Sequence, residues 1–333
     1  MSATPDFQSL QNRLIKNQRH LAKWARRQQI SCYRLYDRDI PAFPLVIDLY
    51  TRWQAESNHP AELWLHLQEF DTGWQQTEED YLFWQEGVLQ AVGAAMQIPV
   101  ERIVFKLRAR QRSEEGGRAQ YEKTGESGTD FIVQEGRIKL WVNLQSYLDS
   151  GLFLDHRPLR RWLAEQSQGR RVLNLFAYTA AFTVHAAVGG ASYSETVDLS
   201  NTYQAWSARN FELNGLNRAK HVLIRADVFR YLDEAIQANK QFDVIVLDPP
   251  TFSNSKKMDD VLDIQRDHRR LIDACLDLLA EGGRLIFSTN YLGFKLDADL
   301  LGLPDIRAEE VSSWSVPEDC RDRKIHRAWW FVR

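Results

Sequence analysis

Short apolar runs alternate with amphipathic segments through the second half of the chain. Runs rich in β-branched residues predict strands that begin at Arg171 and span 193–197, 221–224, 242–247 and 283–288. Helical spacing and end signals predict helices over 180–188, 201–213 and 264–279. Because strands alternate with helices, this half is predicted to form a doubly wound parallel α/β sheet.

The first half predicts a different arrangement. Phe7, Leu10, Leu14, Leu21 and Trp24 fall on one helical face at about 100° per residue. After this helix the pattern predicts strands near 32–36, 45–50, 63–70 and 102–110, a helix near 78–96 and strands within 131–143. We therefore expect a basic amphipathic helix over 1–30, a small α+β subdomain over 31–150 and a Rossmann-like domain over 151–333.

The candidate chemistry begins where the run 242–247 stops. Asp248 follows this run directly, and Pro249 and Pro250 come next. Proline has no N–H for a strand ladder, so the strand must end here. Ligands of open α/β sheets bind outside the carboxyl ends of strands, so Asp248 and Phe252 are predicted to project into a site. A carboxylate, two rigid rings and an aromatic face suit a flat base, although a structural turn is the alternative.

Two more strand ends carry hydrogen-bond acceptors. Asp198 stands about 20 positions after the first loop, where a Rossmann-type site places its ribose-binding carboxylate. Asp227 follows the strand 221–224 and suits an adenine edge. The first loop has no Gly-x-Gly-x-x-Gly, and no Gly-Lys-Ser/Thr occurs in the chain, which disfavours a pyrophosphate ligand. S-adenosylmethionine lacks a pyrophosphate and fits, with 174–179 as the close backbone turn.

Particular segments carry a family resemblance: 174–179, 197–200, 248–258 and 287–290, with 23–27, 32–37, 140–144 and 147–157 before them. Together they resemble the RlmK-type 23S ribosomal RNA methyltransferases. That resemblance implies a class I S-adenosylmethionine-dependent fold and methylation of guanine N7 in 23S rRNA or a large-subunit precursor. In many bacteria such enzymes form the C-terminal half of a fused protein, RlmKL. One departure is Ala180-Ala181, where the family usually has a glycine.

The resemblance also supplies site residues, because 147–157 looks like the extra cofactor motif that related RNA methyltransferases place before the Rossmann core. The candidate catalytic residues are Asp248, Pro249, Pro250 and Phe252. The candidate cofactor-binding residues are Phe153, Leu154, Asp155, Arg157, Asn174, Phe176, Ala177, Tyr178, Thr179, Asp198, Leu199, Ser200, Asp227, Val228 and Asp248.

Charge distribution points to a nucleic acid, although the net charge of −3 does not. All charged residues between Phe7 and Tyr36 are basic, and the run 102–112 places cations at alternate positions. In that run Ile103, Phe105, Leu107 and Ala109 are expected to face inward and the cations outward. Phosphate binding is favoured over a merely solvated face or a membrane-surface helix. The candidate RNA-binding residues are Arg13, Lys16, Arg19, Lys23, Arg26, Arg27, Lys106, Arg108, Arg110, Arg112, Asn254, Lys256 and Lys257.

The alternatives for the chemistry differ in what they require. Carbon-5 methylation of a pyrimidine needs a thiolate, yet Cys32, Cys275 and Cys320 all lie away from the expected site. Amino-group methylation uses a motif much like 248–252 and is the main rival. Guanine N7 has a lone pair and no proton to lose, so it needs only in-line placement and removal of water. A non-catalytic RNA-binding module with this fold also remains open.

Other features bound the setting. No apolar run reaches membrane-spanning length and no signal peptide stands at the N-terminus, so we expect a cytoplasmic enzyme. The cysteines have no metal-type spacing, and we expect no metal. Any RNA-unwinding help that the fused half gives in RlmKL is expected either to come from a separate RNA-unwinding or methyltransferase protein or to be unnecessary. The sequence leaves the oligomeric state open.

Overall fold

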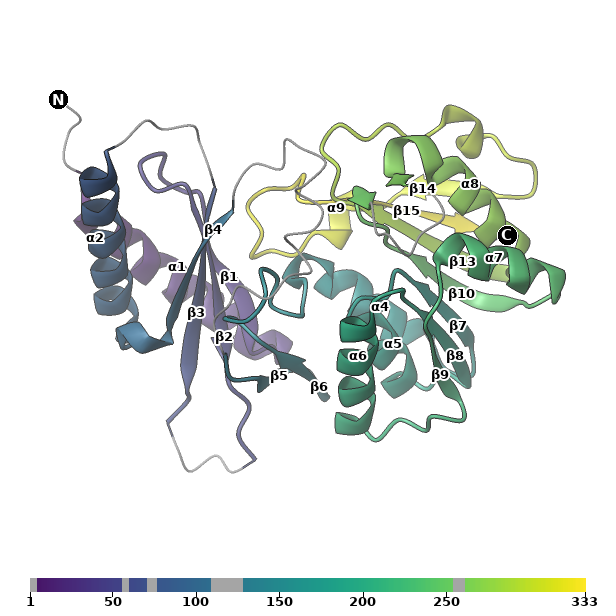
Figure 1. Cartoon of the computed structure of the whole chain (residues 1–333), viewed down its shortest axis with the longest axis horizontal. Helices are drawn as coiled ribbons and strands as arrows, with labels where there is room; N and C mark the ends of the chain where they lie inside the picture. Colours follow the sequence, from purple (N-terminus) through teal and green to yellow (C-terminus); the bar gives the residue numbers. More distant parts are fainter. Residues whose placement is uncertain (1–4, 56–59, 71–76, 109–127, 254–260) are drawn as a thin grey trace. The chain divides into compact units, whose positions relative to one another are not determined.

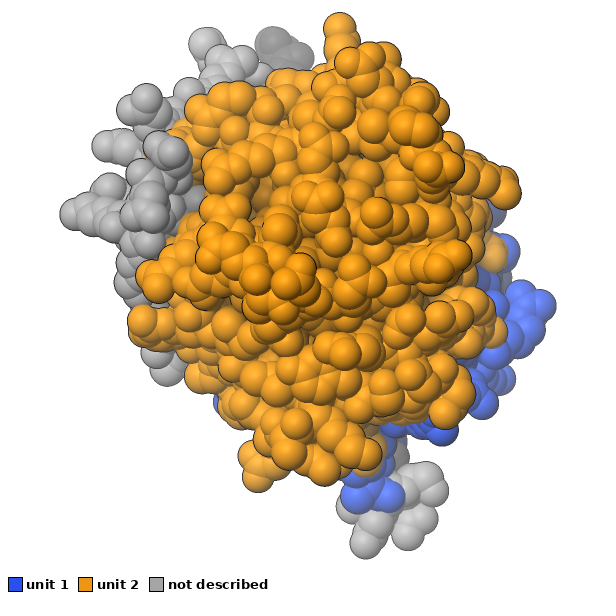
Figure 2. Space-filling model, turned by 90° about the vertical axis from the view of Figure 1, so that its right-hand side faces the viewer, with its two compact units in different colours: residues 1–137, 142–150 blue, residues 138–141, 151–333 orange. Residues whose placement is uncertain are grey.

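The computed structural model describes residues 5–55, 60–70, 77–108, 128–253 and 261–333 (Figure 1). The chain forms two compact units, coloured blue and orange in Figure 2. Unit 1 comprises residues 1–137 and 142–150, and unit 2 comprises residues 138–141 and 151–333. Among the placed residues, no helix is long and apolar enough to cross a membrane.

Unit 1 is built on a four-stranded sheet with the order β1-β2-β3-β4. Its elements are α1 (Phe7–Gln28), β1 (Cys32–Asp37), β2 (Leu45–Thr51), β3 (Leu63–Phe70), α2 (Glu78–Met96), the 3-10 turn η1 (Val100–Arg102) and β4 (Ile103–Arg108). The strand β4 pairs parallel to β3, and α2 makes the crossover between them. Apolar side chains of α1 and α2 pack on one face of this sheet, so the amphipathic helix predicted at the N-terminus is confirmed as part of a core.

The opposite face of the same sheet is also covered, and this corrects one prediction. Lys106 is 8% exposed, and its ammonium donates a hydrogen bond to the carbonyl of Tyr147. Leu107, predicted to face inward, is 55% exposed. Gln68, the register neighbour of Lys106 on β3, is buried as well. Ile103 and Phe105 do pack against the helical core, as predicted, so the prediction was wrong only in placing Lys106 in solvent and Leu107 in the core. Alternation alone does not show whether the second face of a sheet is open to solvent.

Unit 2 contains a seven-stranded sheet with the order β14-β15-β13-β10-β7-β8-β9. Its strands are β7 (Arg171–Leu175), β8 (Tyr193–Val197), β9 (His221–Ile224), β10 (Phe242–Leu247), β13 (Leu279–Thr289), β14 (Arg307–Glu310) and β15 (Arg327–Val332). The five strands from β7 to β13 are parallel, but β15 runs antiparallel to both of its neighbours. The parallel sheet predicted for these five strands is confirmed, and β14 and β15, which were not predicted, add an antiparallel edge to it.

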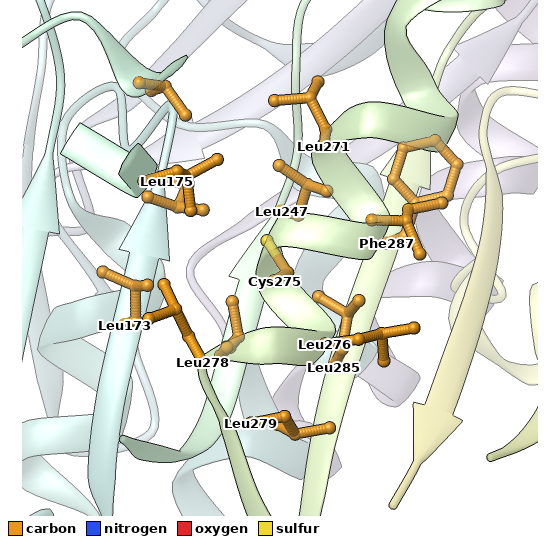
Figure 3. Close-up of a cluster of buried hydrophobic side chains, with 14 of the residues drawn as sticks. Leu173, Leu175, Leu247, Leu271, Cys275, Leu276, Leu278, Leu279, Leu285 and Phe287 are labelled. Carbon is orange, nitrogen blue, oxygen red and sulfur yellow. The ribbon is translucent and has the colours of Figure 1, made fainter. Parts of the chain in front are cut away.

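Helices cover both faces of this sheet (Figure 1). They are η2 (Leu154–His156), α4 (Arg157–Gln166), α5 (Ala181–Val188), α6 (Asn201–Leu213), α7 (Val228–Gln237), α8 (Ile264–Asp277), η3 (Ala298–Leu301) and α9 (Ser312–Ser315). The helices α7 and α8 pack on one face, where Leu271 and Cys275 meet leucines of β7 and β10 (Figure 3). The helices α4 and α5 pack on the other. The helices α4 and α7 were not predicted from the sequence.

Two short ribbons complete the described secondary structure. They are the pair β5 (Phe131–Glu135) and β6 (Ile138–Val142) and the pair β11 (Phe252–Ser253) and β12 (Leu262–Asp263). The second ribbon follows directly from the loop after β10, so it extends from the carboxyl edge of the large sheet.

Candidate active site

The register of the central strands gathers the predicted site at one sheet edge. Leu247, the last residue of β10, pairs with Leu175 of β7 on one side and Phe287 of β13 on the other. Leu175 in turn pairs with Val197, the last residue of β8. The residues that come next in each strand, among them Asp198 and Asp248, therefore lie along the same carboxyl edge, where open α/β sheets bind ligands.

The loop after β7 turns sharply. Phe176, Tyr178 and Ala180 have φ values of +53°, +53° and +62°, the left-handed region that residues with a Cβ seldom adopt. Hydrogen bonds hold this conformation: the backbone N–H of Ala177 donates to the carbonyl of Val197 at 3.1 Å. The hydroxyl of Thr179 donates to the Gly151 carbonyl at 2.7 Å. The loop is thus a tight, strained turn, and Ala180 adopts the backbone conformation for which a glycine is better suited.

Asp198 binds this loop to the start of α6. Its Oδ2 accepts the backbone N–H of Tyr178 at 2.9 Å, and its Oδ1 accepts the N–H of Ser200 at 2.8 Å. Burial raises the pKa of Asp198 to about 6, although the two N–H donors work to lower it. Ser200 caps α6 by accepting the N–H of Tyr203, as its position before the predicted helix indicated.

Asp227 and Asn174 have structural partners that sequence analysis did not assign. Asp227 is the N-cap of α7 and accepts the N–H of Arg230 at 3.2 Å. The amide of Asn174 is buried and donates to the hydroxyl of Thr183 at 2.9 Å. The hydroxyls of Thr183 and Thr196 are in turn hydrogen-bonded at 2.9 Å. The Asn174 side chain therefore supports the sheet interior beneath the loop. Leu199 is half-buried and Val228 is buried at the first position of α7.

Of the predicted cofactor-binding residues in the segment before β7, one is exposed near the loop after β7 and others are buried in the interior. The ring of Phe153 is 38% exposed and lies 5.1 Å from the ring of Tyr178. Leu154 and Arg157 are both buried, and the guanidinium of Arg157 donates to Asp319 at 2.9 Å. The side chain of Arg157 is therefore held in the interior, whereas Phe153 presents an aromatic surface beside the strained turn.

Asp248 is held from the neighbouring strand. Its Oδ1 accepts the hydroxyl of Ser288 on β13 at 2.5 Å. Beyond Pro249 and Pro250, the hydroxyl of Thr251 donates to Asn290 at 2.7 Å. Phe252 begins β11 and is 39% exposed, which leaves a ring available for stacking. The candidate guanine-edge donors Asn254, Lys256 and Lys257 lie outside the described residues.

A cluster that sequence analysis did not expect stands beside Asp248. The cluster consists of Asp155, His156 and His326. Each has one atom that could bind a metal ion, and these three atoms lie within 4.8 Å of one another. Nδ1 of His326 is 2.8 Å from Asp155 and its Nε2 is 2.8 Å from the hydroxyl of Ser315, so both ring nitrogens have partners. Burial lowers the pKa of His156, while Asp248 and Asp155 act to raise it. The sequence predicted Asp155 as a cofactor-binding residue but did not indicate that His326 lies beside it, because the two residues come from opposite ends of unit 2.

The candidate RNA-binding residues differ in how far they are available to a ligand. Nε of Arg13 lies 3.7 Å from Oδ2 of Asp39, with which it forms an ion pair. Arg108 is the last residue of β4, and Arg110 and Arg112 lie outside the placed ranges. On α1, one exposed row of cations remains as predicted: Lys16, Arg19, Lys23, Arg26 and Arg27. Part of that row lines a shallow hollow together with Asn12 and His20.

Comparison with known proteins identifies the family. The profile of the S-adenosylmethionine-dependent methyltransferases matches residues 94–312, more than half of the chain. This chain belongs to that family. S-adenosylmethionine is therefore its cofactor, and the acceptor Asp198 beside the tight turn fits a ligand that has no pyrophosphate. The cofactor identity inferred from the missing phosphate motifs is confirmed.

Two relatives indicate which kind of methyltransferase this chain resembles. The chain is 51% identical over 324 residues to the ribosomal RNA large subunit methyltransferase K of Neisseria meningitidis, covering 97% of this chain and 87% of that protein. It is 47% identical over 325 residues to the ribosomal RNA large subunit methyltransferase K/L of Cellvibrio japonicus, covering 97% of this chain and 42% of that protein. The chain therefore spans less than half the length of the K/L protein.

Solved structures confirm the fold. The crystal structure of SMU.776, a protein proposed to be a methyltransferase and complexed with SAH, aligns over 100% of this chain and 83% of its own with a TM-score of 0.75 and 24% identity. A Streptococcus mutans protein, proposed to be a SAM-dependent methyltransferase, aligns over the same shares with a TM-score of 0.73 and 22% identity. The Rossmann-like class predicted from strand and helix alternation is thus confirmed.

Proposed function

We propose that this enzyme transfers a methyl group from S-adenosylmethionine to N7 of a guanine in 23S rRNA of the large ribosomal subunit. The names of the K and K/L relatives support the substrate. One observation supports the reaction most. Asp248, which accepts the hydroxyl of Ser288, and the exposed ring of Phe252 follow β10, and Asp198 follows β8, two positions away in the same sheet. A base-binding motif and a cofactor carboxylate therefore share one edge.

In the proposed reaction the main task of the protein is to position the base against the methyl group of the cofactor. The bound cofactor supplies an electrophilic methyl group. The N7 lone pair forms the new carbon–nitrogen bond, the carbon–sulfur bond breaks, and sulfur retains that electron pair. The guanine ring gains positive charge, which the nearby carboxylate of Asp248 stabilises. Phe252 stacks on the extruded base, and no side chain has to accept a proton.

The described site disfavours the two rival chemistries. All three cysteines are buried, and burial raises the pKa of the Cys275 thiol, so a thiolate route to carbon-5 has no accessible nucleophile. Amino-group methylation relies on an acceptor for the amino hydrogen. One oxygen of Asp248 already holds the hydroxyl of Ser288 at 2.5 Å, which reduces its capacity for that role.

The exposed cations of α1 are proposed to bind phosphates of the rRNA. Lys16, Arg19 and Lys23 recur at three- and four-residue spacing on the exposed side of the helix, while Leu14 and Leu21 anchor its other side in the core. Among the placed residues, no ion pair involves any of these three cations, which leaves them available for RNA.

The reaction is tested by chemical cleavage of the product. Reduction with borohydride followed by aniline breaks an RNA chain at 7-methylguanosine, so primer extension on treated 23S rRNA should report one new stop after incubation with enzyme and cofactor. Phe252→Ala should abolish most of this stop while S-adenosylmethionine affinity is retained, because stacking on a base contributes about 1–3 kcal/mol. Phe252→Tyr keeps the ring and should restore it. Methyl incorporation without any aniline-sensitive stop would contradict N7.

A further inference from the structure

The carboxylate of Asp248 has a different neighbour at each oxygen. Oδ1 accepts the hydroxyl of Ser288 at 2.5 Å. Oδ2 faces Nδ1 of His156, at 3.6 Å. Ser288 comes from β13, on the neighbouring strand, whereas His156 comes from η2, in the segment before the sheet. The two neighbours therefore approach Asp248 from separate parts of unit 2.

The ring of His156 is itself held in place. Its exposed fraction is 6%, and it lies between the ring of Phe182 at 5.7 Å and the ring of His326 at 4.6 Å. His326 cannot turn freely, because Asp155 and Ser315 occupy its two nitrogens at 2.8 Å each. These ring contacts hold the imidazole beside Asp248.

His156 has hydrogen-bonding capacity that the fold leaves unused. Its Nε2 is buried without a hydrogen-bond partner among the described residues and stands 3.9 Å from the carboxylate of Asp155. Buried polar groups are normally hydrogen-bonded, so such an atom calls for an explanation other than packing. The other nitrogen of the same ring, Nδ1, faces the Asp248 carboxylate of the proposed catalytic motif, at 3.6 Å.

We propose that His156 is a positioning residue that, together with Ser288, fixes the orientation of the Asp248 carboxylate toward the substrate base. The inference rests on the function proposed above. Catalytic hydrogen bonds often tighten only when substrate is bound, so the present 3.6 Å separation closes to a hydrogen bond in the productive complex.

The protonation state of His156 suits this role. Burial lowers its pKa, against the opposite pull of Asp248 and Asp155, and His326 and Arg160 add to the lowering. The ring is therefore neutral near pH 7 and donates from Nδ1 without bringing a positive charge. A cation at this place would cancel the charge of Asp248 just where positive charge develops on the guanine. A neutral donor orients the carboxylate and preserves its electrostatic effect.

Three variants of this histidine separate positioning from packing. His156→Asn keeps a donor near the place of Nδ1, facing Asp248. His156→Gln places its donor near the place of Nε2, facing Asp155 instead. His156→Leu removes both donors. Each variant is measured with 23S rRNA from a strain that lacks the enzyme, for kcat and KM, with S-adenosylmethionine affinity and thermal unfolding followed in parallel.

His221→Asn is the matched control. His221 is also 6% exposed and bonds Ser194 at 2.9 Å, but it begins β9 and so lies at the opposite edge of the sheet. It should change stability and leave kcat unaltered.

The expected result is a split between variants. His156→Leu and His156→Gln should lower kcat about 10-fold to 100-fold, the effect of losing a hydrogen bond to a charged group, with unchanged cofactor affinity. His156→Asn should recover most of this loss. Wild-type kcat in the folded Leu variant, or rescue by Gln and not by Asn, would overturn the inference. The product assay keeps the two proposals apart: a folded, fully active Leu variant that still makes 7-methylguanosine refutes only the role of His156, whereas a different methylated nucleoside refutes the proposed reaction.

Discussion

Asp198 accepts the backbone N–H of Tyr178 at 2.9 Å, so the carboxylate at the end of β8 also holds the loop that follows β7. The same carboxylate accepts the N–H of Ser200 at the start of α6. One side chain thus joins three segments at the carboxyl edge of the sheet. Its substitution is therefore expected to disturb both the proposed acceptor for the cofactor and the strained turn beside it.

The first prediction concerns this dual role. Asp198→Asn replaces one carboxylate oxygen with an NH2 group, which then faces a backbone donor instead of accepting from it. S-adenosylmethionine affinity should fall at least about tenfold, since a hydrogen bond to a charged group contributes roughly 1.5–3 kcal/mol. Isothermal titration calorimetry measures this directly.

Asp243→Asn provides the control for that measurement. Asp243 also accepts a backbone N–H, from Arg171 at 2.7 Å, but at the beginning of β10 and so at the other sheet edge. Its substitution should leave cofactor affinity at the wild-type value. Equal loss in both variants would mean that Asp198 acts only through general stability.

The second prediction follows from the pKa of Asp198, which burial raises to about 6. The folded chain binds more protons than the unfolded chain between about pH 4 and pH 6, so this group makes the protein less stable as pH rises through that window. Cofactor affinity should run the other way, because ribose hydroxyls donate to the ionised form. Titrations should give about tenfold weaker binding at pH 5 than at pH 8. Asp198→Asn should remove this dependence; an unchanged slope in that variant would assign it to another group.

The third prediction isolates the strain at Ala180, whose φ is +62° and which is fully buried. Ala180→Gly removes a buried methyl group but relieves the left-handed conformation. Ala186→Gly removes an equally buried methyl group from the interior of α5, where no such strain exists. Glycine also costs about 1 kcal/mol of helix propensity at Ala186. Urea unfolding should therefore show Ala180→Gly to be less destabilising by about 2–3 kcal/mol, of which about 1–2 kcal/mol is relieved strain. A difference of about 1 kcal/mol or less would show that the loop carries no strain at this residue.

The fourth prediction tests the cationic row of α1. Replacing Lys16, Arg19 and Lys23 by Gln should weaken rRNA binding and flatten its salt dependence. Each lost phosphate contact should remove about 0.7–0.9 from the slope of log affinity against log salt concentration. Filter binding across a salt series gives this slope, and cofactor affinity should not change.

An equal change of net charge elsewhere controls for long-range electrostatics. Arg161, Arg230 and Arg307 are exposed and each forms an ion pair with a glutamate. Their triple Gln variant should keep the wild-type slope. Identical slopes in the wild type and in both triple variants would mean that the α1 cations form only a solvated helix face.

Much of unit 2 was predictable because local signals and tertiary packing agree there. Ser200 stands before an apolar pattern that ends at Asn214-Gly215, and α6 spans the predicted 201–213. The missed helix α7 also had a signal: Asp227 is a good N-cap, and Tyr231, Leu232 and Ala235 follow at helical spacing.

What the sequence could not disclose depends on contacts between distant segments. Lys106 looked like an outward cation, yet Tyr147 supplies the carbonyl that makes its burial possible. Asp155 and His156 lie in the segment 147–157, but no motif connects that segment with His326, which lies just before the antiparallel strand β15 and beside η2. Pairwise contacts of this kind leave no trace in periodicity.

The most direct measurement is the identity of the methylated nucleoside. Purified enzyme is incubated with S-adenosylmethionine that carries a deuterated methyl group and with 23S rRNA from a strain that lacks the enzyme. The RNA is then digested to nucleosides for mass spectrometry. The account predicts labelled 7-methylguanosine, formed equally well by Cys275→Ala and Cys320→Ala. Label in N2-methylguanosine, N6-methyladenosine or a 5-methylpyrimidine, or loss of product in either folded cysteine variant, would contradict it.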